Sequence, residues 1–227
     1  MFADTATIDY VYYISETEVT YELWEKIHTW ATDPNRGEKR YYFQNDGWAG
    51  AIVPGQPLEP VTSINWRDAI VWCNALTEYY NEKPGVSLNY VYTSGGEPIR
   101  DSRDSNGTMC DTVVASMNAI GFRLPTTQEW ELAARYIDGV DWLPYNHASG
   151  DLFGACYAPP EGETISTTIG DYAWYEENSN NDTHPVGEKE RNGFGLFDMS
   201  GNVWEWCFDR HPKSDTRRIT RGGDYRS

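Results

Sequence analysis

Apolar residues recur at helical spacing in two or three stretches of the chain. After Thr20 they occupy one face of residues 21–31, which predicts a helix. A second stripe runs from Trp66 to Tyr80, with Ser63 or Asn65 as the N-cap. A third helix is predicted after residue 126, because 126–129 reads Thr-Thr-Gln-Glu, a capping box.

Short apolar or alternating runs predict strands at residues 10–14, 88–92 and 203–208, and the last of these is expected to be buried. Three intervening stretches are polar and rich in turn residues, with no sustained period, which predicts long ordered loops. No internal repeat is visible. This mixture of helices and scattered short strands indicates an α+β fold rather than βαβ units.

Length and charge narrow the class of protein. A chain of 227 residues is compatible with one large domain. Its net charge of −17 argues against nucleic acid as a partner, because phosphate binding depends on Lys and Arg. No apolar run reaches the length of a membrane span and no signal peptide is visible, so composition leaves localisation open, export included.

Cysteine and histidine spacing indicates no catalytic or zinc site. The four cysteines form no metal-binding doublet and could pair in three ways, while Cys73 lies on an apolar stripe and is interpreted as a core residue. The four histidines lack ligand spacing and are expected at the surface. No nucleophile, base and orienting group can be named, which favours a non-catalytic protein. The cysteines are Cys73, Cys110, Cys156 and Cys207.

Four short sequence motifs lie between residues 17 and 206, and Arg-Gly-Gly follows them at 221–223. They are Thr-Glu-Val-Thr at 17–20; Pro-Val-Thr at 60–62 with Trp-Arg-Asp-Ala at 66–69; Gly-Phe-Arg-Leu-Pro-Thr at 121–126 with Glu-Trp-Glu at 129–131; and Asn-Gly-Phe-Gly-Leu-Phe-Asp-Met-Ser-Gly-Asn-Val-Trp-Glu-Trp at 192–206. The last block is very specific. Together they resemble the formylglycine-generating-enzyme and sulfatase-modifying-factor family.

The resemblance implies a fold and a domain organisation. The expected fold is α+β and C-type-lectin-like, with few helices, short strands and much irregular loop. The expected organisation is a single sulfatase-modifying-factor-like domain over residues 1–227, lacking its C-terminal part.

The resemblance also implies a structural calcium ion. Its ligands would be a side-chain oxygen of Asp198, the backbone carbonyls of Gly201 and Val203, and the carboxylate of Glu205. Such an oxygen set suits a hard cation. Without the resemblance, Glu205 would be interpreted as a buried partner for an arginine.

Oxidase members of the family bind copper(I) through two cysteines shortly after the Arg-Gly-Gly landmark, in keeping with the preference of this soft ion for thiolates. In this sequence residues 224–227 are Asp-Tyr-Arg-Ser, and no cysteine follows Cys207. We therefore expect no copper and no formylglycine-generating activity.

Other members, the variable proteins of diversity-generating retroelements, use the segment near Arg-Gly-Gly as a ligand surface. By that resemblance Asp224, Tyr225 and Arg226 begin a surface that binds a protein or other surface ligand. The resemblance favours a cell-surface or exported location. The alternative is a fragment of a copper-dependent formylglycine-generating oxidase or a related enzyme.

Overall fold

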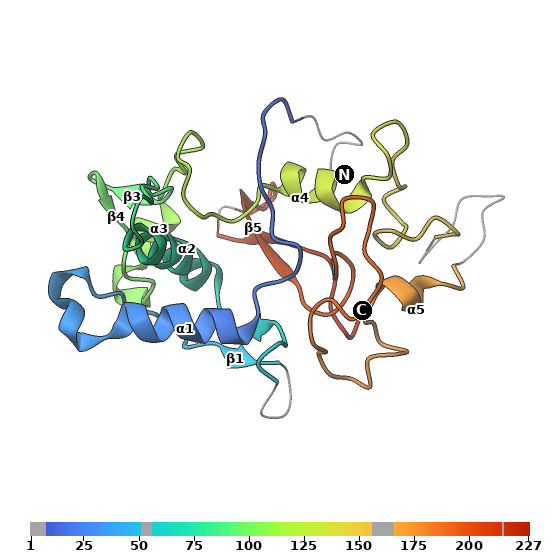
Figure 1. Ribbon diagram of the computed structural model, residues 1–227, viewed down its shortest axis with the longest axis horizontal. Coiled ribbons are helices and arrows are strands. Elements are labelled where there is room, and N and C mark those ends of the chain that lie inside the picture. The colour runs from blue at the N-terminus through green and yellow to red at the C-terminus, as the bar shows by residue number, and fades with distance from the viewer. Residues whose placement is uncertain (1–7, 51–55, 156–165, 215) are drawn as a thin grey trace. The chain divides into compact units, whose positions relative to one another are not determined.

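The computed structural model describes residues 8–50, 56–155, 166–214 and 216–227 (Figure 1). The chain forms two compact units, each assembled from separated stretches. The first unit comprises Met1–Thr20, Ala49–Pro60 and Pro125–Ser227, and the second comprises Tyr21–Trp48 and Val61–Leu124. Among the described residues, no helix is both long and apolar enough to cross a bilayer.

Two packed helices form the centre of the second unit, α1 (Tyr21–Thr32) and α2 (Trp66–Asn81) (Figure 1). The buried rings of Trp24 and Trp72 stack with their centroids 5.4 Å apart. Asn65 begins α2 with a capping box, since its side chain and that of Asp68 each accept the other residue's backbone N–H. Both predicted helices are therefore confirmed.

The other helices and strands between residues 34 and 111 are short. They are η1 (Pro34–Lys39), β1 (Trp48–Ala49), β2 (Val61–Thr62), β3 (Thr93–Ser94), β4 (Glu97–Pro98), η2 (Asp104–Asn106) and α3 (Gly107–Asp111).

The strand predicted at residues 88–92 is wrong. The strands that form are β3 and β4, and the glycines of their two-residue turn, Gly95 and Gly96, have φ values of 61° and 89°. Such a pair favours a tight hairpin. Residues 88–92 bond instead to side chains of α2: Asn81 accepts from the Leu88 amide, and Asn74 donates to the Tyr92 carbonyl.

A buried carboxylate organises the polar interior of the second unit. Glu78, on α2, accepts hydrogen bonds from the hydroxyls of Tyr41 and Tyr90 and pairs with Arg36 and Arg100. Burial raises the pKa of Glu78, but the hydrogen bonds from Arg100 and Tyr41 lower it by more, so the carboxyl stays ionised. The two arginines therefore share one buried anion.

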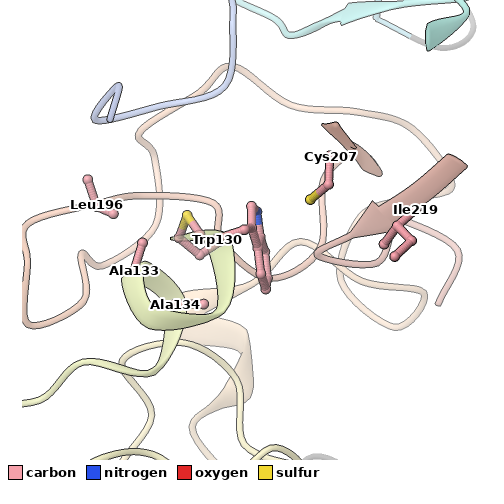
Figure 2. Packing of buried hydrophobic residues seen from close by; sticks show 7 residues of the cluster. Trp130, Ala133, Ala134, Leu196, Cys207 and Ile219 are labelled. Carbon is pink, nitrogen blue, oxygen red and sulfur yellow. The ribbon is translucent and has the colours of Figure 1, made fainter. Parts of the chain in front are cut away.

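The core of the first unit lies between helix α4 (Thr127–Arg135) and the antiparallel strands β5 (Glu205–Arg210) and β6 (Arg218–Arg221). The strand predicted at 203–208 therefore forms two residues later, and of its residues only Cys207 is fully buried. Helix α5 (Ile169–Tyr172) also belongs to this unit. Figure 2 shows the apolar cluster, made of Trp130, Ala133, Ala134, Leu196, Met199, Cys207 and Ile219.

The strand predicted at residues 10–14 is wrong, since the structure has no strand there. Side-chain bonds replace the strand ladder. The hydroxyl of Tyr10 donates to Glu129 Oε1 over 2.9 Å, and that of Tyr12 donates to the Glu129 carbonyl over 2.8 Å. Neighbouring side chains of this run still alternate between packed and exposed positions. Ile14 packs against the apolar cluster, whereas Tyr13 is exposed.

The predicted capping box of α4 is confirmed. Thr126 Oγ1 accepts from the Glu129 amide over 3.1 Å, and Glu129 Oε2 accepts from the Thr126 amide over 2.8 Å. The helix ends at Arg135, before the turn at 138–139, because Tyr136 is already extended. This box orients the helix that carries Trp130 into the core.

We predict that Thr126→Ala destabilises the protein by about 0.5–2 kcal/mol, because the first turn of α4 loses its side-chain acceptor. Urea unfolding should show a lower midpoint. Thr126→Ser, which keeps the hydroxyl, is the control and should lie close to the parent protein. Equal midpoints for the alanine and serine variants would contradict this role of the cap.

We also predict that Glu78→Gln destabilises the protein by about 3–5 kcal/mol, since it leaves buried arginine charge uncompensated. Glu82→Gln is the matched control: Glu82 also pairs with Arg36, but its side chain is 56% exposed. Its expected cost is about 0–1 kcal/mol.

The pKa of Glu78 is lowered in the folded protein. Its contribution to stability is therefore present above the unfolded carboxyl pKa and is lost as the pH falls through the folded value. Thermal melting at neutral and acidic pH should show the gap between Glu78→Gln and the parent protein narrowing in acid. A gap that is constant with pH would argue against a charge effect.

Candidate functional site

The loop that leads into β5 has an unusual backbone. Asp198 and Asn202 have φ values of 55°, and Gly201 has 81°, all in the left-handed region. A Cβ atom at Gly201 would lie 2.0 Å from the Trp174 carbonyl oxygen, so this position requires glycine. The Gly201 amide donates to the Gly222 carbonyl, and the Asn202 amide donates to the Trp174 carbonyl. Two backbone hydrogen bonds therefore fix the loop, one to Gly222 and one to Trp174.

Asn202 is fully buried and joins three distant segments. Its Nδ2 donates to Glu18 Oε2 over 2.8 Å, and its Oδ1 accepts from the His184 amide over 3.0 Å. Its carbonyl accepts from the Tyr225 amide over 3.0 Å. The side chain and the backbone carbonyl of Asn202 together connect the N-terminal part of the first unit with its C-terminal segment.

Two carboxylates of this region have raised pKa values. Asp198 is 2% exposed; its Oδ2 accepts from the Gly187 amide over 2.7 Å, whereas its buried Oδ1 has no hydrogen-bond partner. Burial raises the pKa of Asp198. Burial raises the pKa of Glu205 to about 7, and the negative charge of Asp198 adds to the effect. A cation would offset both penalties.

Gly222 leaves open the space beside Glu205. A Cβ atom there would lie 3.7 Å from Glu205 Oε1 and 3.7 Å from the Val203 carbonyl oxygen. The structure therefore brings these two predicted ligand oxygens to one small space. Gly201 and Asp198 lie in the loop immediately before it. Oxygen donors, an unpaired buried oxygen and a glycine-lined space fit a hard cation.

Glu18 is a member of this region that the sequence reasoning missed. Its Oε1 accepts from the Val203 amide over 3.2 Å. Burial raises its pKa well above the usual range, and the charges of Asp198 and Glu205 raise it further. It belongs to the block at 17–20, which was the available signal, but it lies about 180 residues away along the chain.

The described residues contain no group of three His, Cys, Asp or Glu side chains placed to hold a metal by themselves. A cation in this region would therefore need backbone carbonyls as well as carboxylates, as the predicted ligand set already requires. Calcium accepts such mixed oxygen coordination.

The predicted ligand-surface residues follow Gly223. Tyr225 is buried, and its carbonyl accepts from Ser179 Oγ over 2.8 Å. Arg226 is exposed; its Nε donates to Asn181 Oδ1 over 3.1 Å, and its guanidinium carbon lies 4.9 Å from the centre of the Tyr225 ring. Asp224 Oδ1 accepts from Ser227 Oγ and from the Arg226 amide. The segment is thus fixed by its backbone and exposes an arginine.

Three cysteines, Cys73, Cys110 and Cys207, are buried and form no disulfide within the described residues. Burial raises the pKa of each thiol to about 12, so none is a thiolate at neutral pH. The interpretation of Cys73 as a core residue is confirmed. Cys156 lies outside the described residues.

The expectation that the histidines lie at the surface is wrong, because all four are half-buried. The ring of His184 stacks on Trp174 at a centroid distance of 3.7 Å, and that of His28 lies 4.7 Å from the ring of Phe43. For His28 and His184, aromatic neighbours, which spacing along the sequence does not reveal, contribute to this burial.

Comparisons with known proteins agree with this architecture. The chain is 33% identical over 219 residues to chaperone protein LppX of Paenibacillus barcinonensis, covering 94% of this chain and 69% of that protein. It is 32% identical over 207 residues to a formylglycine-generating enzyme of Thermomonospora curvata, covering 79% of this chain but 61% of the enzyme.

Among solved structures, Treponema denticola variable protein 1 matches with a TM-score of 0.62 and 29% identity, over 92% of this chain and 72% of that one. The predicted fold is therefore confirmed. The family described as the sulfatase-modifying factor enzyme 1-like domain matches residues 3–227. The chain belongs to that family.

Proposed function

We propose that this chain is a non-catalytic ligand-binding domain on the scaffold of the formylglycine-generating enzyme. The ligand surface lies at the segment after Arg-Gly-Gly, with Asp224, Tyr225 and Arg226 as its first residues. The observation that carries the proposal is the anchoring of this segment. Its backbone is bonded to buried groups at Tyr225, while the neighbouring Arg226 side chain faces solvent.

A fixed, exposed arginine suits recognition. The bond from Arg226 to Asn181 and its position over the Tyr225 ring restrict the guanidinium before any ligand arrives. A pre-organised guanidinium loses less freedom on binding and still presents other donors in a fork. The variable protein of Treponema denticola shares this fold, and the relative from Paenibacillus is named a chaperone protein. These likenesses support a protein as the partner.

We propose in addition that Ca²⁺ binds in the loop at residues 198–205. This loop is joined to the surface segment by the hydrogen bond from the Tyr225 amide to the Asn202 carbonyl. Asp198, Gly201, Val203 and Glu205 would hold the ion. Glu18 is not part of this proposed ligand set, and each of its two oxygens accepts one hydrogen bond from the loop. Its charge still adds to the attraction for a cation.

An enzymatic role is the second candidate, favoured by the likeness to the formylglycine-generating enzyme. Copper(I) would require thiolate ligands. The described cysteines are buried, with raised thiol pKa values. None of these three thiols is a thiolate at neutral pH, and the anchored segment at 224–226 supports the binding role.

We predict that Ca²⁺ raises the melting temperature relative to chelated protein. A ligand that binds only the folded state contributes about 2.7 kcal/mol at a hundredfold excess over Kd. For a protein of this size that corresponds to about 5–11 °C. Calorimetry with calcium and with chelator measures the difference.

Glu205→Gln should reduce this calcium response, because it removes one of the two charged ligands. Glu176→Gln is the control: it removes an exposed carboxylate of the same unit and should leave the response unchanged. Identical transitions with and without chelator in the parent protein would show that the site does not bind calcium.

We predict further that the purified chain, supplied with copper and a cysteine-containing sulfatase peptide, leaves the peptide unmodified. Mass spectrometry of the peptide reports conversion of its cysteine to an aldehyde. An active formylglycine-generating enzyme in the same buffer is the positive control. Detectable conversion by this chain would overturn the binding-only proposal and favour the enzyme.

A further inference from the structure

The second unit contains a pocket of about 300 Å³ that has no part in the function proposed above. Helix α1 supplies part of its wall, and the segment after η1 supplies most of the rest. The lining residues are His28, Thr32, Arg40, Tyr41, Tyr42, Phe43, Asp46 and Arg103.

Aromatic rings form much of the lining. The guanidinium carbon of Arg103 lies 4.2 Å from the centre of the Tyr42 ring, and the guanidinium carbon of Arg40 lies 5.2 Å from it. The ring of Phe43 lies 4.7 Å from that of His28. Walls of this kind suit a flat, apolar ligand body.

Two buried nitrogen atoms of the lining lack hydrogen-bond partners. They are Arg40 Nε and His28 Nε2, and the latter lies 3.5 Å from Asp46 Oδ1 without a hydrogen bond. Buried donors without partners are uncommon in folded proteins and call for an explanation. A ligand that accepts hydrogen bonds in this pocket would supply one.

The charges of the lining favour a single negative charge. Arg103 is already paired with Asp101, through bonds of 2.9 and 2.6 Å. Arg40 takes part in no ion pair in the described structure, so its charge is available to a ligand. The Asp46 side chain at the rim is 91% exposed, which weakens its repulsion of a monoanion through solvent. A dianion would feel that repulsion twice.

We propose that this pocket binds a small monocarboxylate with a planar apolar body, such as an aromatic acid. The carboxylate accepts from Arg40 Nε and from His28 Nε2, and the body lies against Tyr42 and Phe43. Burial lowers the pKa of His28, which keeps the ring neutral with one N–H to donate. The site lies in the second unit, so it neither requires nor tests the calcium ion or the C-terminal surface.

Benzoate is the probe, titrated into the full chain and followed by calorimetry and by the backbone amide signals in ¹⁵N NMR. Saturable movement of the signals of residues 40–46 is expected. Benzamide, which has the same shape without the charge, should bind at least about tenfold more weakly, because charge-assisted hydrogen bonds are about twice as strong as neutral ones. This comparison needs no variant.

Arg40→Gln should weaken benzoate binding by about tenfold or more. Lys39→Gln is the matched control, since it removes the same charge from an exposed neighbour outside the pocket and should leave the affinity within about twofold. Thr32→Phe should abolish binding by filling the pocket while keeping Arg40. If Arg40→Gln does not fold, the Thr32→Phe variant tests whether benzoate binds in this pocket.

Three results would each overturn the proposal. The first is the absence of saturable amide movement with benzoate, and the second is equal binding of benzamide. The third is displacement of benzoate by equimolar inorganic phosphate, which would indicate a site for phosphate rather than for a planar carboxylate.

Discussion

The buried amide of Asn202 is the interaction on which the first unit depends. Its side chain and backbone connect Glu18, His184, Trp174 and Tyr225, four residues that come from separate parts of the sequence. In a unit with one principal helix and one strand pair, few backbone groups can find partners in regular structure. Side-chain amides take over that task, and each must be fully satisfied because an unpaired buried group is costly.

The same amide brings acidic groups together. Glu18 reaches the loop through Asn202 and Val203, and the charges of Asp198 and Glu205 then add to the rise of its pKa. Burial raises the pKa of all three carboxyls. Retaining three such groups in one buried region opposes folding unless protons or a cation offset the charge. A bound cation would offset the charge at neutral pH, which gives the calcium proposal a basis beyond resemblance.

Local signals allowed the helices to be predicted, whereas distant partners made the strands and part of the site unpredictable. The box around Thr126 is complete within four residues, so its geometry follows from the sequence alone. The run at 10–14 has strand composition, but its hydroxyls bond to Glu129, far along the chain. Glu18 was missed for the same reason. The proposed ligand oxygens at 198–205 follow only from the family resemblance. By itself, an acidic residue between two tryptophans is equally compatible with a buried partner for an arginine.

Asn202 also connects the two proposed sites of the first unit. It lies between the candidate calcium ligands Gly201 and Val203, and its carbonyl holds the amide of Tyr225, next to the exposed Arg226. An ion that fixes this loop would therefore also fix the backbone from which Arg226 projects. If ordering of that backbone contributes to ligand affinity, binding at either site must strengthen binding at the other by the same factor. The coupling needs no movement of one unit against the other, since every contact in it lies within the first unit.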